Sequence, residues 1–188
     1  MSVRRITRVA MGVALFTVLS LMLQVPVYQN YYVSLGYFVM AVWLYSFGVI
    51  DGTITGTLGV VLYCVITGGM RGMPGWTLGN FFIGLEIGCM FMGTKHLYEQ
   101  YKEKNDKVGI AILSMIQSVF IIISVIIGIL IVKSFTEVVL YAQPMLVRMA
   151  TNTAATIADA ITLILALPVA IFMDSILKKR FPQLIEAI

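Results

Sequence analysis

The stretch VGIAILSMIQSVFIIISVIIGILIV, residues 108–132, decides the fold of this chain. It is 25 residues long and contains no charged side chain. A helix needs about 20 mostly apolar residues to cross the hydrocarbon core of a bilayer. A strand of an outer-membrane barrel would instead alternate apolar and polar residues over about ten positions. The stretch therefore predicts a membrane-spanning helix.

The composition of the whole chain indicates the same environment. Of the 188 residues, 60% are hydrophobic and only 12% are charged, and the mean hydropathy is +0.95. In soluble domains, roughly a quarter of all residues are charged. The length allows about six spans with short loops and leaves little room for a soluble domain. We expect an all-α integral membrane protein with one membrane domain over residues 1–188.

Turn-forming residues divide the chain into six expected transmembrane helices. The segment VPVYQNYY interrupts a charge-free run over residues 9–50, and Asp51 and Gly52 predict a corner after the second helix. The segment KSFTEVVLYAQ is expected to form a loop, Pro144 suits the first turn of the last helix, and Pro168 predicts a kink in it. The expected helices cover residues 6–25, 34–50, 53–67, 76–98, 108–132 and 144–177.

Basic residues predict the orientation in the membrane, because cytoplasmic loops retain Lys and Arg. Most of the basic residues lie on the side of the predicted bundle that carries both termini. Both termini are therefore expected in the cytoplasm, with the chain in the plasma membrane. The net charge of +4 reflects this topology rather than a nucleic-acid partner, because the basic residues stand in small clusters at the ends of apolar runs. Ten of the thirteen lie on one side of the predicted bundle: Arg4, Arg5, Arg8, Lys95, Lys102, Lys104, Lys107, Lys178, Lys179 and Arg180.

A narrow polar stripe marks the last predicted helix. At about 100° per residue, Arg148, Asn152 and Asp159 share one face with small residues. Ionisable groups near the bilayer interior usually face a polar cavity or a partner charge, so the stripe is expected to face inward. Asn152 is a candidate for ligand binding. For Asp159 a binding role and a hydrogen bond to a neighbouring helix are both open, and Arg148 could also extend to the outer interface.

The fourth predicted helix places an indole and an amide on one face. Trp76 and Asn80 are four residues apart, just below the loop that holds Arg71. An aromatic plane beside an amide suits a flat or amphipathic small molecule. The alternative for Trp76 is the aromatic belt of the interface. Glu86 is turned about 120° from Asn80, so it need not share the cavity.

Pairs of small residues four apart predict close helix contacts in lipid. Gly75 and Gly79 form one such pair, and most pairs are expected to pack within the chain. Ala10 and Ala14, near the cytoplasmic end of the first helix, could equally pack against another subunit.

Catalysis finds little support in the sequence. The one histidine, His96, has no second His, Cys or carboxylate pair at the spacing of a metal site or triad. No glycine-rich loop with Lys and Ser or Thr is present to hold a phosphate. We expect no enzyme activity, no catalytic or metal-binding residue and no cofactor bound by this chain. If ATP drives its work, another chain must hydrolyse the ATP.

With these features assembled, the chain resembles the substrate-binding S components of energy-coupling factor (ECF) vitamin transporters of group II. The resemblance is carried by RVAMGVA, FGVIDGTITGTLGVVLY, PGWTLGNFFIGLEIG and ATNTAATIADAITLILALPVA in this order. It implies six helices with cytoplasmic termini, and docking through Ala10 and Ala14 on a transmembrane T subunit that binds two ABC-type ATPases. It also implies a vitamin site near the outer face, formed by Tyr28, Asn30, Arg71, Trp76, Asn80, Gln117 and Asn152, although Gln117 lies deep in its helix. Arg148 is a further candidate because of its place on the polar stripe.

The sequence favours an anionic vitamin. Arg71 and Arg148 are basic groups without an evident counter-charge on the outer side, which points to pantothenate. Thiamine, riboflavin, pyridoxine and hydroxymethylpyrimidine stay open as substrates. Two alternatives from other classes are a self-sufficient secondary transporter, with Asp159 or Glu86 relaying protons, and a structural subunit without a ligand.

Overall fold

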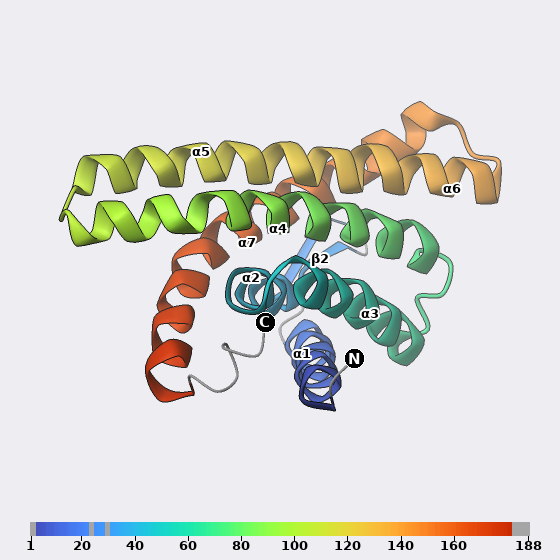
Figure 1. Cartoon of the computed structure of the whole chain (residues 1–188). Coiled ribbons are helices and arrows are strands. Elements are labelled where there is room, and N and C mark those ends of the chain that lie inside the picture. Colours follow the sequence, from blue (N-terminus) through green and yellow to red (C-terminus); the bar gives the residue numbers. More distant parts are fainter. Residues whose placement is uncertain (1–2, 23–24, 29–30, 182–188) are drawn as a thin grey trace.

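The computed structural model describes residues 3–22, 25–28 and 31–181 as a bundle of helices with one short hairpin (Figure 1). The hairpin is antiparallel and links the first two helices. The helix after α4 is a continuous rod in three parts, whose middle part, η1, is a π-helix. Counting that rod once, the six predicted helices are present. The elements are α1 (Val3–Met22), β1 (Val25–Tyr28), β2 (Tyr31–Val33), α2 (Gly36–Phe47), α3 (Val49–Thr67), α4 (Met73–Glu103), α5 (Lys107–Val125), η1 (Ile126–Lys133), α6 (Ser134–Tyr141) and α7 (Met145–Arg180).

Four of these helices are long and apolar enough to span a membrane: Val3–Met22, Val49–Thr67, the rod Lys107–Tyr141, and Met145–Arg180. Helix α2 is apolar but has only 12 residues. Helix α4 has 31 residues, and its last third is polar. The chain is therefore a helical membrane protein, as predicted.

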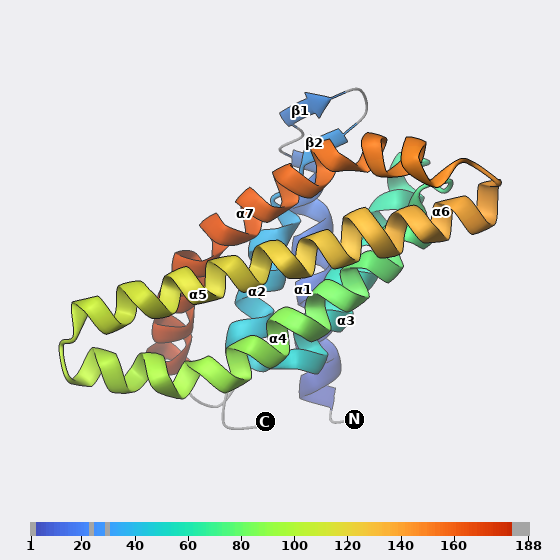
Figure 2. The same ribbon diagram turned by 90° about the horizontal axis from the view of Figure 1, so that it is seen from above.

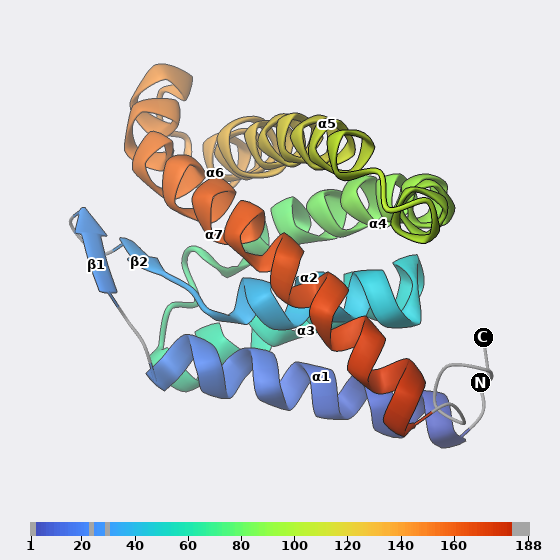
Figure 3. The ribbon, with the colours of Figure 1, turned by 90° about the vertical axis from the view of Figure 1, so that its left-hand side faces the viewer.

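The two ends of the bundle differ in charge. The first turn of α1, the last turn of α7 and the connection between α4 and α5 lie at one end, and the hairpin and α6 lie at the other (Figure 3). The ten basic residues named in the sequence analysis therefore gather at the end that carries the first turn of α1.

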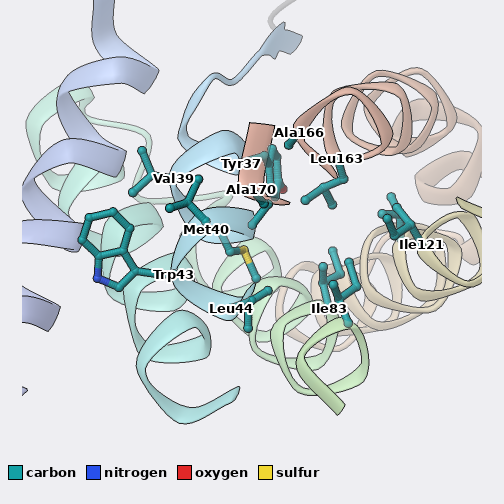
Figure 4. Close-up of a cluster of buried hydrophobic side chains, with 14 of the residues drawn as sticks. Tyr37, Val39, Met40, Trp43, Leu44, Ile83, Ile121, Leu163, Ala166 and Ala170 are labelled. Atoms are coloured by element: carbon teal, nitrogen blue, oxygen red, sulfur yellow. The ribbon is translucent and has the colours of Figure 1, made fainter. Parts of the chain in front are cut away.

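The short helix α2 lies in the centre of the bundle and packs against α1, α3, α4 and α7. Every residue from Gly36 to Phe47 is buried except Phe38. A helix that is apolar all round has no solvent face and is stable only when neighbours cover it on all sides. Tyr37, Met40 and Leu44 of α2 thus reach toward Ile83 of α4 and Leu163 of α7 in one core (Figure 4).

Helix α4 and the rod run antiparallel, side by side, along the length of the molecule (Figure 2). Glycines permit their close approach. A Cβ atom on Gly79 would lie 2.6 Å from the carbonyl oxygen of Gly128, and one on Gly75 would lie 3.0 Å from that of Lys133. The Gly75 and Gly79 pair therefore packs internally, as expected.

The structure corrects three boundaries. The corner after α2 lies at Gly48, whose φ of +92° suits glycine, while Asp51 and Gly52 belong to the first turn of α3. The predicted loop at KSFTEVVLYAQ is helical to Tyr141, because it contains neither Gly nor Pro and its charged residues point into the bundle.

The segment around VPVYQNYY contains the hairpin, which was not predicted. Pro168 lies inside α7, which changes direction along its length (Figures 1 and 2).

Candidate binding site

A tyrosine hydroxyl connects three helices in the half of the bundle near the hairpin. Tyr37 of α2 is fully buried, and its hydroxyl accepts a hydrogen bond from Trp76 Nε1 at 3.0 Å. The same hydroxyl lies 2.9 Å from Asn80 Oδ1 and 3.0 Å from Asp159 Oδ2. Asn80 Nδ2 donates to the carbonyl oxygen of Gly56 at 3.3 Å, which fixes the amide with its oxygen toward Tyr37.

The Tyr37 hydroxyl shares one hydrogen between two acceptors. A phenol has a single hydrogen to donate, whereas Tyr37 faces two acceptor oxygens, on Asn80 and Asp159. At any moment one of the two lacks this hydrogen when Asp159 is ionised.

Charged side chains continue the site toward the hairpin end. Asn152 of α7 donates to Ser134 Oγ at 2.9 Å and to Glu137 Oε2 at 3.1 Å. Arg148 Nε lies 3.5 Å from the same Glu137 oxygen. This nitrogen is buried and makes no hydrogen bond to any described residue.

Lys133 joins the two groups of residues. It is buried, and it lies close enough to Glu137 and Asp159 to interact electrostatically with both. Its Nζ is 5.8 Å from the centre of the Trp76 ring, within the range of a cation–π contact.

We call these residues the Tyr37 cluster. Its formal charges balance, because two cationic and two acidic side chains are present. Burying a charge without a partner is more costly than burying it beside an opposite charge, and here each charged group has an opposite charge in the cluster. The members are Tyr37, Trp76, Asn80, Lys133, Ser134, Glu137, Arg148, Asn152 and Asp159.

Four predicted site residues come together in this cluster: Trp76, Asn80, Arg148 and Asn152. The polar stripe of α7 faces inward, as expected, since Asn152 and Asp159 are buried and Arg148 is half-buried.

Arg71 and Gln117 lie elsewhere. Arg71 is exposed in the turn before α4, with its guanidinium carbon 5.1 Å from the centre of the Tyr141 ring. Gln117 is buried, and its side chain donates to Thr94 Oγ1 at 2.8 Å. It precedes Lys133 by sixteen residues, roughly 24 Å along the rod, so the structure does not bring Gln117 into the cluster.

The two predicted residues of the first loop stay predictions. Tyr28 belongs to β1, and its side chain is not described. Asn30 lies outside the described residues.

Four members of the cluster are not evident from the sequence: Tyr37, Lys133, Ser134 and Glu137. Tyr37 carries no signal, because every neighbour in α2 is apolar. Lys133 and Glu137 are four residues apart, the spacing of neighbours on one helix face, and this spacing was the available clue.

The small residues of α1 lie on its outer surface. Ala10 and Ala14 are exposed, whereas Arg8, Gly12 and Phe16 of the same helix are buried. The alanines therefore do not pack within the described part of this chain, and their docking role stays a prediction.

A comparison with family models identifies the family of this chain. The model of the ECF-type riboflavin transporter S component matches residues 1–175. The chain belongs to this S component family. Neither a curated protein nor a solved structure matches it.

Membership sets the general role of this S component. The family is one of transport subunits for vitamin-type substrates and is not a family of enzymes. S components in general work with T and ATPase subunits. The resemblance found in the sequence is thus confirmed at the level of the family.

Proposed function

We propose that this S component binds a neutral, flat vitamin at the Tyr37 cluster, with riboflavin as the first candidate. The balanced charge of the cluster carries this proposal, because a ligand with net charge would leave one buried charge without a partner. The matching family model is named for riboflavin transport, which supports the same choice. Trp76 offers an aromatic surface to a flat ring, and the acceptor oxygens beside Tyr37 suit an imide N–H or a sugar-alcohol hydroxyl.

Pantothenate is the second candidate. The sequence-based argument for it relied on Arg148 having no counter-charge, but Glu137 lies within ion-pair distance of Arg148. Arg71 keeps the anion alternative open, because it contacts Tyr141 and forms no ion pair with an acidic side chain among the described residues.

The orientation and partners follow from the family and the charge distribution. We infer that the end carrying the ten basic residues is cytoplasmic, which places both termini there and the Tyr37 cluster near the outer face of the plasma membrane. We further infer that exposed Ala10 and Ala14 dock on a T subunit, and that two ABC-type ATPases bound to that subunit hydrolyse ATP.

A ligand screen on the purified chain in detergent tests the substrate. Riboflavin, pantothenate, its uncharged alcohol panthenol, and thiamine are each added while thermal unfolding is followed. A ligand at 100 times its Kd stabilises the native state by about 2.7 kcal/mol, so riboflavin is expected to raise the unfolding midpoint. Stabilisation by pantothenate but not by panthenol or riboflavin would contradict the proposal in favour of an anion.

The variant Tyr37→Phe tests the site. It removes the hydroxyl that joins Trp76, Asn80 and Asp159, and we expect riboflavin affinity to fall about ten-fold or more. Tyr98→Phe, at the opposite end of α4, is the matched control and is expected to bind like wild type. Equal affinities of the two variants would place the vitamin outside the Tyr37 cluster.

Reconstitution separates the S component from a self-sufficient transporter. Vitamin uptake into liposomes is expected only when the T and ATPase subunits are present together with ATP. Uptake by this chain alone would favour the secondary-transport alternative, in which Asp159 or Glu86 carries protons.

A further inference from the structure

A buried aspartate binds two arginines of α1 at the end of the bundle opposite the Tyr37 cluster. Asp51, in the first turn of α3, is 1% exposed. Its Oδ1 accepts from Arg5 Nε at 2.6 Å, and its Oδ2 accepts from Arg8 Nε at 2.9 Å and from Arg8 Nη2. The three side chains thus form a fork in which one carboxylate holds two turns of α1.

Further contacts fix the same face of α1. The Arg8 guanidinium lies over the Phe47 ring at 4.7 Å, and Trp43 Nε1 donates to the Arg8 carbonyl oxygen at 3.1 Å. One turn later, a Cβ atom on Gly12 would lie 2.6 Å from Trp43 Nε1. Backbone and side chains of α1 are therefore held in this region by α2 and α3 together.

The exposed alanines lie across the helix from this fork. At about 100° per residue, Ala10 is about 160° from Arg8 around the axis, and Ala14 is about 120° from it. A rotation of α1 by about 30° would move its outer surface, at a radius of about 5 Å, by about 2.6 Å. Contacts between small residues require close approach of two backbones, and such a displacement removes them.

We propose that Asp51 is a positioning residue for subunit docking: by holding Arg5 and Arg8, it sets the rotation of α1 and hence the direction of Ala10 and Ala14. This inference rests on the docking role proposed above for the two alanines. Asp51 itself is buried and does not touch the partner. Its effect is expected on assembly and transport, and not on vitamin binding at the other end of the bundle.

The variant Asp51→Asn tests this, because it keeps the shape of the side chain and removes its charge. Co-purification with the organism's own T and ATPase subunits is expected to fall at least ten-fold, while the riboflavin affinity of the isolated chain stays within about two-fold of wild type. Asp51→Glu is expected to restore most of the assembly.

Asp174→Asn is the matched control. Asp174 is also buried at this end and binds two basic residues, Lys95 at 3.0 Å and Lys178 at 3.1 Å, but it holds α7 and not α1. Its replacement is expected to reduce assembly less than three-fold. Equal losses in the two variants would show a general effect of losing a buried aspartate and would overturn the proposal.

Further outcomes are decisive. Wild-type assembly of Asp51→Asn, or a parallel loss of vitamin binding and assembly, overturns the role of Asp51. If Asp51→Asn does not fold, Arg5→Gln removes the more exposed partner, and unchanged assembly of that variant overturns the proposal. Ala10→Trp with Ala14→Trp tests the docking surface separately: normal assembly of this double variant would refute the docking role itself, whatever Asp51→Asn does.

Discussion

Replacing Gly79 by alanine is expected to separate α4 from η1 and to destabilise the chain. The new Cβ atom would lie 2.6 Å from the carbonyl oxygen of Gly128 and 3.3 Å from Cδ1 of Ile129. Carbon-to-oxygen contacts at close helix interfaces lie at about 3.3–3.6 Å, so the two backbones must move apart by about 0.7 Å or more. The obstacle is backbone rather than a flexible side chain, and overpacking of this kind costs about 1–3 kcal/mol.

Gly93 provides the control on the same helix. Apart from its own helix backbone and chain neighbours, no atom of the described residues lies within 4 Å of a Cβ atom placed there, and the residue is exposed. Alanine at an unobstructed helical position is favoured over glycine by about 0.5–1 kcal/mol. Both replacements gain this helix propensity, so the two variants are expected to differ in free energy of unfolding by the overpacking cost alone, about 1–3 kcal/mol, with Gly79→Ala the less stable.

The measurement is a reversible denaturant titration of each purified variant in detergent micelles, followed by titration with riboflavin. Because Trp76 and Lys133 face each other across the same contact, Gly79→Ala is also expected to weaken binding about ten-fold, and Gly93→Ala is not. Equal stability and equal affinity of the two variants would show that α4 and η1 do not meet as closely as described.

Other variants test which residues contribute to vitamin binding and to the stability of the cluster. Asn80→Ala and Asn152→Ala should each weaken vitamin binding about ten-fold by calorimetric titration, because a lost buried hydrogen bond costs about 1–3 kcal/mol; wild-type affinity in both would place the site elsewhere. Gln117→Leu should change the affinity by less than two-fold, and a ten-fold loss would bring this residue into the site after all. Lys133→Met should destabilise the chain by about 3–5 kcal/mol, because it leaves buried acidic groups short of a cation. Adding Glu137→Gln should recover at least about 1 kcal/mol of that loss in the unfolding titration, and strictly additive losses would mean that the two residues do not interact.

Part of the site could be predicted because its residues follow helical spacing. The stripe on α7 unites Arg148, Asn152 and Asp159 on one face, and charged residues in lipid have few alternatives to facing inward. Trp76 and Asn80 are likewise one turn apart on α4. In each case a single helix carries the whole pattern, so the sequence is sufficient to find it.

The missed residues needed information from more than one helix. Tyr37 lies in a helix that is buried all round, so no periodicity distinguishes the face that meets Asn80 and Asp159. Lys133 and Glu137 fall in KSFTEVVLYAQ, the segment that is expected from the sequence to form a loop. The opposite charges of Lys133 and Glu137 interact with each other, and Lys133 also interacts with Asp159 of α7. These interactions allow both side chains to remain inside the bundle.

The π-helix η1 has a consequence for the alignment of the rod that contains it. In an uninterrupted α-helix, Ile121 and Glu137 are sixteen residues apart and would point about 160° away from each other. Both side chains are nevertheless buried in the bundle. The π-helix η1 has wider turns than an α-helix, with hydrogen bonds that reach five residues back. These turns change the angle around the rod axis between Ile121 and Glu137, so that both can face the bundle. Deleting one residue within η1 would rotate one end of the rod by about 100° relative to the other. Glu137 would then turn away from Arg148 and Asn152, although none of the three side chains had been altered.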